Sequence, residues 1–180
     1  YAESGAETEQ KYIDEALALS AGFEKAVVFA GLTDLTESEG GDRADMRLPQ
    51  NQIALVDALI GAGKKVVLVL FGGSPVELPF AEEVSAVLDM YLPGQCGGKA
   101  CADLLFGRAE PAGRLAETWP MRGEDVPFTE DFAKTVNEVY KESVFVGYRY
   151  YATADKKVRF PFGYGLSYTD FAFSDCTASL

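Results

Sequence analysis

A short acidic loop contains the side chains of this sequence that are best suited to chemistry. Residues 36–43 read Thr-Glu-Ser-Glu-Gly-Gly-Asp-Arg and directly follow the apolar run 26–31. Open α/β sheets place their reacting groups just beyond the carboxyl ends of buried strands. If residues 26–31 form such a strand, Glu37 and Glu39 lie where a proton donor or acceptor is useful. The loop therefore raises the hypothesis of an enzyme.

The type of chemistry is restricted because the sequence contains no histidine. Ser-His-Asp triads, Cys-His pairs, imidazole metal ligands and histidine bases are all excluded. Proton transfer then depends on carboxylates, lysine, tyrosine or cysteine. Carboxylates are the most numerous of these, with 28 Asp and Glu residues against 16 Lys and Arg. An active site in this chain would therefore use carboxyl groups.

The composition limits the classes of partner. A length of 180 residues, 48% of them apolar, is enough for one globular domain. The net charge of −12 argues against binding to nucleic acid or anionic lipid, both of which attract basic surfaces. No apolar stretch approaches the roughly 20 residues that cross a bilayer, and residues 1–5 lack the features of a signal peptide. We expect a soluble domain whose ligand is a neutral or polar small molecule.

The three cysteines do not indicate a disulfide framework. Cys96, Cys101 and Cys176 are few and odd in number, which favours buried thiols and a reducing compartment such as the cytoplasm. Cys96 and Cys101 are too far apart for a zinc knuckle, and no other metal ligands cluster near them. The phosphate-loop pattern at 58–65 is incomplete, because Ala58 and Lys65 replace two of its required residues. The glycines of 94–98 favour tight strand-to-helix packing over phosphate binding. The sequence contains no dinucleotide fingerprint. We expect no metal and no cofactor.

The elements that must position the acidic loop alternate between strands and helices. Apolar residues spaced three or four positions apart predict helices, and short apolar runs bounded by glycine or proline predict buried strands. The order of strand, helix and strand is typical of a βαβ unit in a parallel sheet. In chain order we expect a helix over 7–21, a strand over 25–30, a helix from 48 that ends at 61–63, a strand over 65–71, a strand over 85–91, a helix over 97–106 and an extended segment over 113–120.

The pattern changes beyond residue 120. Residues 121–142 are polar and irregular and predict a long loop that packs on a partner surface. The aromatic segments 144–151 and 160–168 form either a dense core or a platform for sugar rings. Residues 169–180 alternate apolar and polar side chains. They therefore begin a neighbouring module or add a strand to the edge of the main sheet.

Eight short motifs, in order along the chain, resemble those of a known family. They include Glu-Gly-Gly-Asp-Arg at 39–43, Pro-Gly-Gln at 93–95 and Phe-Pro-Phe-Gly-Tyr-Gly-Leu-Ser-Tyr at 160–168. The set looks like the second, α/β sandwich domain of the β-glucosidase-like enzymes of glycoside hydrolase family 3. The remaining motifs lie at 48–49 with Gln52, 73–79, 102–107, 111–115 and 145–151.

The resemblance implies a fold and a domain organisation. Such domains are three-layer α/β sandwiches with a mostly parallel, six-stranded sheet between helices. Residues 1–168 would form this domain, and 169–180 would be a stub leading into a fibronectin type III-like domain. The implied partners are a TIM-like barrel domain of the same enzyme and a β-linked glycoside or oligosaccharide. Assembly into a homo-oligomer stays open.

The resemblance also implies the chemistry. In such retaining β-glycosidases one carboxylate attacks the anomeric carbon while another protonates the leaving oxygen and then activates water. The nucleophile is an aspartate of the barrel, which is not in this sequence. The acid/base glutamate matches Glu39, because it precedes a Gly-x-Asp-Arg sequence. Glu37 is the alternative, and a purely solvated or structural acidic loop is the third reading. Asp42 and Arg43 would form an ion pair that fixes the loop, and Glu77 would be structural.

Without the barrel, the isolated chain would be inactive, and the sugar and linkage are not encoded in it. Two other classes of function stay open. One is a non-catalytic carbohydrate-binding or scaffold module, in which the aromatic segments stack on sugar rings. The other is a free-standing flavodoxin-like binding domain, although the phosphate-binding loop that such proteins need is missing.

Overall fold

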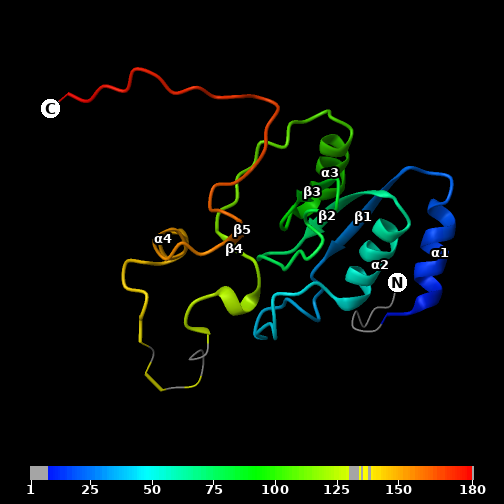
Figure 1. Cartoon of the computed structure of the whole chain (residues 1–180), viewed down its shortest axis with the longest axis horizontal. Coiled ribbons are helices and arrows are strands. Elements are labelled where there is room, and N and C mark those ends of the chain that lie inside the picture. The colour runs from blue at the N-terminus through cyan, green and yellow to red at the C-terminus, as the bar shows by residue number, and fades with distance from the viewer. Residues whose placement is uncertain (1–7, 130–133, 135, 138, 180) are drawn as a thin grey trace.

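The computed structural model describes residues 8–129, 134, 136–137 and 139–179. A three-stranded sheet with its helices forms the main body, and a two-stranded sheet and an extended C-terminal segment lie beside it (Figure 1). No helix in the described part is long and apolar enough to cross a membrane. The predicted α/β class is confirmed.

A parallel sheet organises the main body. β1 (Lys25–Gly31), β2 (Lys65–Phe71) and β3 (Ala86–Asp89) pair in the order β1-β2-β3. Leu70 lies opposite Asp89 in the register. Because the strands are parallel, their carboxyl ends meet at one edge of the sheet. The three predicted strands are confirmed, although β3 is slightly shorter than expected.

Three α-helices accompany the sheet. α1 (Gln10–Ser20) and α2 (Gln50–Gly61) pack against each other, and α2 also contacts β1 and β2. α2 connects β1 to β2 and so completes the predicted βαβ unit. The short 3-10 helix η1 (Gly94–Cys96) leads into α3 (Gly97–Leu105), which lies away from α1 and α2 (Figure 1). The three predicted helices are confirmed, and residue 7 of the first lies outside the described residues.

One apolar core lies between the sheet and α2. Leu68 and Leu70 of β2 point toward it on alternate positions. Val56 and Leu59 of α2 belong to the same cluster. The connector between β2 and β3 adds three further buried side chains, Val76, Leu78 and Phe80.

The opposite face of β1 is open within the described residues. Alternate side chains of a strand point to opposite faces, so the burial of Val28 and Ala30 directs Val27 and Phe29 to the other side. Val27 is 48% exposed and Phe29 is 53% exposed. β1 is also the outer strand of the sheet. Parallel sheets are normally covered on both faces, so an open apolar face is unusual for a complete domain.

A small antiparallel pair lies beside the main body. β4 (Trp119–Pro120) pairs with β5 (Val158–Phe160). The Trp119 and Phe160 rings meet edge to face, with centroids 5.9 Å apart. Between these strands the chain forms the 3-10 helix η2 (Gly123–Asp125) and the short helix α4 (Tyr148–Thr153).

The aromatic segments contribute both core and surface. Tyr151 is buried, and Phe160 packs against the main core. Tyr148 and Phe162 instead stack on each other at 5.1 Å and are each about half exposed. The core hypothesis is confirmed for part of these segments, and stacking on sugar rings stays a prediction.

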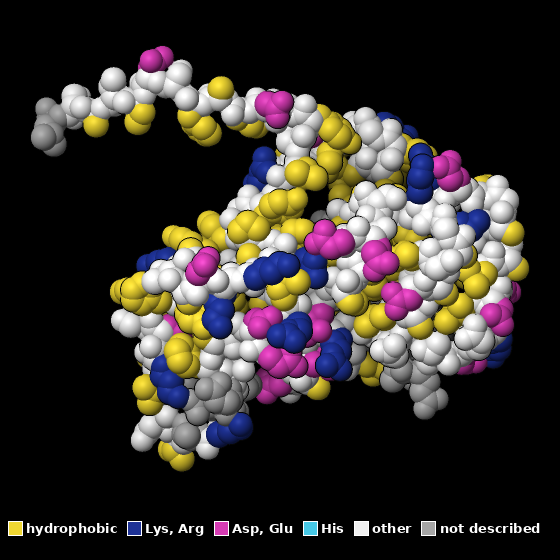
Figure 2. Space-filling model, in the orientation of Figure 1, with side chains coloured by type: hydrophobic (Ala, Val, Ile, Leu, Met, Phe, Trp, Pro, Cys, Tyr) yellow, Lys and Arg dark blue, Asp and Glu magenta, His cyan; other side chains and the backbone are white. Residues whose placement is uncertain are grey.

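The expectation of a six-stranded sheet is wrong for the part of the chain that the structure describes. The main sheet has three strands and the separate sheet has two. Within 113–120 only β4 is a strand, because Leu115 exchanges backbone hydrogen bonds with Gly163 and Tyr164 and not with the main sheet. Residues 169–179 form no strand, and the tail leaves the body with apolar side chains along it (Figures 1 and 2). An added edge strand is therefore also excluded for them.

Two further predictions are resolved in part. Among the described residues of 121–142, the structure contains η2, 3-10 helical conformation at Thr129 and no strand. Residues 130–133, 135 and 138 lie outside the described residues, so the packing of this loop on a partner stays a prediction. Cys101 is buried, but Cys96 and Cys176 are exposed. The expectation of buried thiols is wrong for these two, which lie before α3 and in the extended tail.

Candidate active site

The acidic loop follows the carboxyl end of β1, and a side chain of α2 holds the backbone at that end in place. Gln52 of α2 accepts a hydrogen bond from the Gly31 N–H at 2.8 Å and donates one to the Gly31 carbonyl at 3.0 Å. Gln52 is buried, so this pair of bonds satisfies backbone groups that water cannot reach. A Cβ at Gly31 would lie 1.9 Å from the Phe71 carbonyl oxygen. Only glycine lets the chain pass so close to β2.

The loop begins with a compact turn stabilised by two threonines. Thr36 Oγ1 accepts from the Thr33 N–H at 2.9 Å. The N–H groups of Thr36 and Glu37 both donate to the Thr33 carbonyl at 2.8 Å. This local network orders the approach to the acidic residues.

Glu39 lies at the tip of a second, tight turn. Ser38 and Gly41 form an isolated bridge, so Glu39 and Gly40 are the two central residues. Gly40 has a φ of +80°, which the third position of a type II turn requires and which glycine adopts without strain. The Glu39 side chain is exposed, and within the described part of the chain it makes no hydrogen bond or ion pair. Its carboxyl group is free to meet a partner.

Glu37 has the opposite environment. Its Oε2 accepts from the Gly73 N–H at 2.8 Å, and its Oε1 accepts from the Ser74 hydroxyl at 2.7 Å. Burial raises the pKa of the Glu37 carboxyl, but these hydrogen bonds and the charge of Arg43 outweigh it and leave the pKa below its ordinary value. Glu37 is therefore an ionised anchor whose two oxygens are both occupied.

Arg43 attaches the other end of the loop. Its Nη1 donates to Ser74 Oγ at 2.7 Å and to the Pro75 carbonyl at 3.2 Å. The predicted ion pair with Asp42 is absent from the described residues, in which Asp42 is exposed. Arg43 does fix the loop, but it does so through the turn that follows β2. Sequence reasoning missed Ser74 as the shared partner of Glu37 and Arg43. Ser74 lies 37 positions from Glu37 and 31 positions from Arg43, and no local pattern links residues so far apart.

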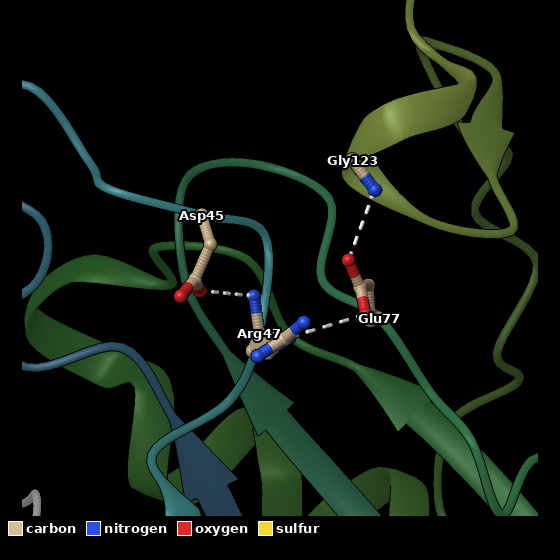
Figure 3. Close-up of polar contacts among 4 residues, drawn as sticks. All are labelled: Asp45, Arg47, Glu77 and Gly123. Atoms are coloured by element: carbon tan, nitrogen blue, oxygen red, sulfur yellow. Dashed lines mark hydrogen bonds and ion pairs between the residues drawn. The ribbon is translucent and has the colours of Figure 1, made fainter.

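Glu77 joins three segments of the chain. Its Oε1 accepts from the Gly123 N–H at 2.9 Å, and its Oε2 lies 3.8 Å from Arg47 Nε (Figure 3). The Arg47 N–H in turn donates to Asp45 Oδ1 at 2.8 Å. The segment between the acidic loop and α2, the connector after β2 and η2 therefore meet at this carboxylate. These contacts agree with the structural role predicted for Glu77.

Sequence reasoning missed two acids near the carboxyl end of β3, the partly buried Asp89 and the exposed Glu117. Asp89 Oδ1 accepts from the Tyr91 N–H at 3.1 Å, and its Oδ2 is buried without a partner among the described residues. Burial raises the pKa of Asp89, and the bond from Tyr91 offsets part of the effect. Burial and the charge of Asp89 likewise raise the pKa of Glu117. The sequence did offer one signal for this site, because Asp89 directly follows the apolar run 86–88.

Other chemistry-bearing groups are sparse in the described ranges. Those ranges contain no cluster of three or more Asp, Glu or Cys side chains that could bind a metal ion. A cavity of about 270 Å³ lies between Phe128, Phe145 and Tyr150. The acidic loop does not line it. Among the described residues, the exposed carboxyl group of Glu39 at the tip of the acidic loop is thus the most accessible candidate for proton transfer.

Fold and site define an α/β domain that presents a free carboxylate at the carboxyl edge of a parallel sheet. The model of the glycosyl hydrolase family 3 C-terminal domain matches residues 2–168. The chain belongs to this family, and the resemblance seen in its motifs is confirmed.

Relatives and solved structures agree with the family. The chain is 47% identical over 168 residues to the thermostable beta-glucosidase B of Acetivibrio thermocellus, covering 93% of this chain and 22% of that protein. It is 41% identical over 159 residues to an exo-alpha-(1->6)-L-arabinopyranosidase of Bifidobacterium longum, covering 87% of this chain and 21% of that protein. The crystal structure of the Kluyveromyces marxianus beta-glucosidase in complex with glucose matches with a TM-score of 0.85 and 40% identity, over 92% of this chain and 20% of that one. The chain thus spans about a fifth of the length of these relatives.

Proposed function

We propose that this chain is the C-terminal α/β domain of a retaining β-glycosidase and that Glu39 is the general acid/base of that enzyme. The observation that carries the proposal is the free carboxyl group of Glu39 at the tip of a fixed turn, in a chain that belongs to glycoside hydrolase family 3. Glu37 is the weaker candidate, because both of its oxygens already accept hydrogen bonds.

The chemistry is divided between domains. Glu39 protonates the departing glycosidic oxygen and then takes a proton from the water that releases the sugar. The nucleophile is an aspartate of a TIM-like barrel in the same enzyme, held on the order of 5 Å from the acid/base carboxyl. An exposed turn suits this arrangement, since Glu39 must reach a sugar bound mainly by the other domain.

The substrate class is a β-linked glycoside, with the sugar selected outside this chain. One close relative is named as a beta-glucosidase and another as an exo-alpha-(1->6)-L-arabinopyranosidase, at 47% and 41% identity. Similar versions of this domain therefore accompany different sugar specificities. The residues that recognise the sugar are expected mainly on the barrel.

The open side of the main sheet supports a second part of the proposal. Other segments of the longer protein complete the sheet toward six strands by pairing with β1 and covering Val27 and Phe29. The exposure of these side chains on an outer strand supports this addition. At the other end, the domain extends to residue 168, and 169–180 leads into a fibronectin type III-like domain. The end of the family match at 168 and the absence of any strand in 169–179 support this boundary.

The proposed role of Glu39 is tested by Glu39→Gln in the full-length enzyme. The amide keeps the shape of the side chain but cannot donate the proton. Turnover of an alkyl glycoside, whose leaving group needs protonation, should fall about 100- to 10,000-fold. Steady-state kinetics at fixed pH measure the loss.

Two comparisons accompany this experiment. Asp34→Asn removes an exposed carboxylate from the turn that leads into the acidic loop and should leave turnover unchanged. The isolated chain should hydrolyse no aryl β-glycoside, because it lacks the nucleophile. Unchanged turnover in Glu39→Gln would refute the assignment.

A further inference from the structure

We propose that Glu37, Ser74 and Arg43 form a positioning clamp that holds the acid/base turn in place for catalysis. The clamp consists of these three side chains, which join both ends of the turn at 38–41 to the chain after β2. The inference rests on the proposed function of Glu39 and deepens it. None of the three residues touches the reacting atoms in this proposal, since they act through Glu39.

The geometry of the clamp centres on one hydroxyl. Ser74 Oγ donates to Glu37 Oε1 at 2.7 Å and accepts from Arg43 Nη1 at 2.7 Å. Glu37 precedes the turn and Arg43 follows it, so a single serine connects both sides. The Gly73 N–H adds a second bond to Glu37 at 2.8 Å, and the Pro75 carbonyl accepts a second bond from Arg43 at 3.2 Å.

The anchor point is tied to the sheet on two sides. Residues 73–75 follow Gly72 at the end of β2, the central strand of the described sheet. The Gly72 N–H also donates to the Tyr91 carbonyl at 3.2 Å, which ties this turn to the chain after β3. A Cβ at Gly73 would lie 3.4 Å from Glu37 Oε1 and 3.3 Å from Leu92. The Glu37 carboxylate therefore sits close against the backbone at a place where a larger residue would crowd it.

Charge strengthens the contacts. The Glu37 carboxylate accepts both of its hydrogen bonds as an anion, and hydrogen bonds to charged groups are stronger than neutral ones. The lowered pKa of Glu37 shows that its surroundings favour the carboxylate form. The loop between the anchors contains the two glycines Gly40 and Gly41, which by themselves leave the backbone flexible. Without the clamp, the glycines would let Glu39 sample many positions.

The consequence is a kinetic one. Displacing a catalytic group by about 1 Å can cost about 100-fold in rate. Loss of the clamp should therefore weaken proton donation by Glu39 without removing the carboxyl group. Glycosides with a good leaving group need no proton for bond cleavage and should be affected little.

The test uses the full-length enzyme and two substrates, an alkyl glycoside and a dinitrophenyl glycoside of the sugar that the enzyme accepts. Ser74→Ala removes the shared hydroxyl, and Ser74→Thr keeps one. We expect Ser74→Ala to lower kcat/KM for the alkyl glycoside about 10- to 100-fold and that for the dinitrophenyl glycoside less than about 3-fold. Ser74→Thr should restore the alkyl value to within about 3-fold of wild type. Glu37→Gln, which removes the charge, should show the same substrate pattern as Ser74→Ala.

The outcomes separate the clamp from the proposed function. Glu39→Gln must discriminate between the two substrates if Glu39 is the acid/base, and failure to do so overturns both proposals. If Glu39→Gln discriminates but Ser74→Ala equals wild type, or lowers both substrates by the same factor, the clamp alone is overturned. Asp34→Asn, in the exposed turn that leads into the acidic loop, is the matched control and should equal wild type on both substrates.

Discussion

At the scale of single residues, the acidic loop shows how two similar side chains acquire different roles. Glu37 and Glu39 are two positions apart and chemically identical. Glu37 accepts hydrogen bonds from Gly73 and Ser74, whereas Glu39 is exposed on a turn. The difference comes from the chain after β2, which contacts one glutamate and leaves the other free. We infer that the first positions the loop and the second transfers the proton.

Asp89 provides a prediction about pH and stability at the same scale. Its pKa in the folded protein is raised above the ordinary value of 3.8, mainly by burial. The native state therefore retains a proton to higher pH than the unfolded chain does, and stability falls as the pH rises from 3.8 toward the raised value. Asp89→Asn should remove this fall and stabilise the protein at neutral pH by up to about 1 kcal/mol, because the carboxylate is partly solvated.

Thermal unfolding of the full-length protein at several pH values would measure the effect. The exposed residue Asp57 on α2 offers a matched control. Asp57→Asn should leave the pH dependence as it is in the wild type. A lower melting temperature for Asp89→Asn at neutral pH would contradict the argument.

At the scale of elements, α2 does more than cover the sheet. It begins directly after Pro49, and its first turn lies against the end of β1, because Gln52 bonds to Gly31 there. Gln52 uses both of its polar atoms on Gly31. The helix that fills the core thus also sets the point at which the acidic loop departs. Packing and positioning are performed by one element.

Gln52→Met should therefore lower the free energy of unfolding by more than the small change in side-chain size suggests. The thioether keeps the length of the side chain but leaves the Gly31 N–H and carbonyl without partners. Each buried group left unsatisfied costs roughly 1–3 kcal/mol, so for these two groups we expect a loss of about 2–6 kcal/mol in the free energy of unfolding. Denaturant titration would measure it, with Gln50→Met, at an exposed position of the same helix, as the control. Equal effects of the two variants would show that the bonds to Gly31 contribute little.

At the scale of the whole molecule, the chain contains a core but not a closed surface. Val56, Val66 and Leu68 are fully buried, while the far face of β1 is open within the described residues. The chain also spans about a fifth of the length of its relatives. We therefore treat the open face as an internal surface of the longer protein.

Val27→Lys tests this view. If other segments cover β1, the lysine places a charge in an apolar interface, and the full-length protein should lose about 3 kcal/mol or more of stability. Leu19→Lys, on the exposed side of α1, is the comparison and should change stability little. Calorimetry of the full-length variants would decide. If Val27→Lys were as mild as Leu19→Lys, the face would be open to solvent in the intact protein.

The sequence alone predicted the elements whose patterns are local. The apolar runs of β1 and β2, the amphipathic helix between them and the acidic loop at the end of β1 all depend on neighbouring residues. The motifs likewise identified the family and singled out Glu39 and Glu37 together.

Contacts between distant segments were decided only in the tertiary structure. Side-chain periodicity does not reveal which strands pair, so the six-stranded sheet was an expectation from resemblance, and Leu115 paired elsewhere. The separation of Glu37 from Glu39 depended on Ser74, 37 positions along the chain from Glu37. Asp89 and Glu117 acquired their raised pKa values from burial that no local pattern encodes. Local patterns determine which elements form, whereas the environment of a carboxyl group is created by the segments that fold against it.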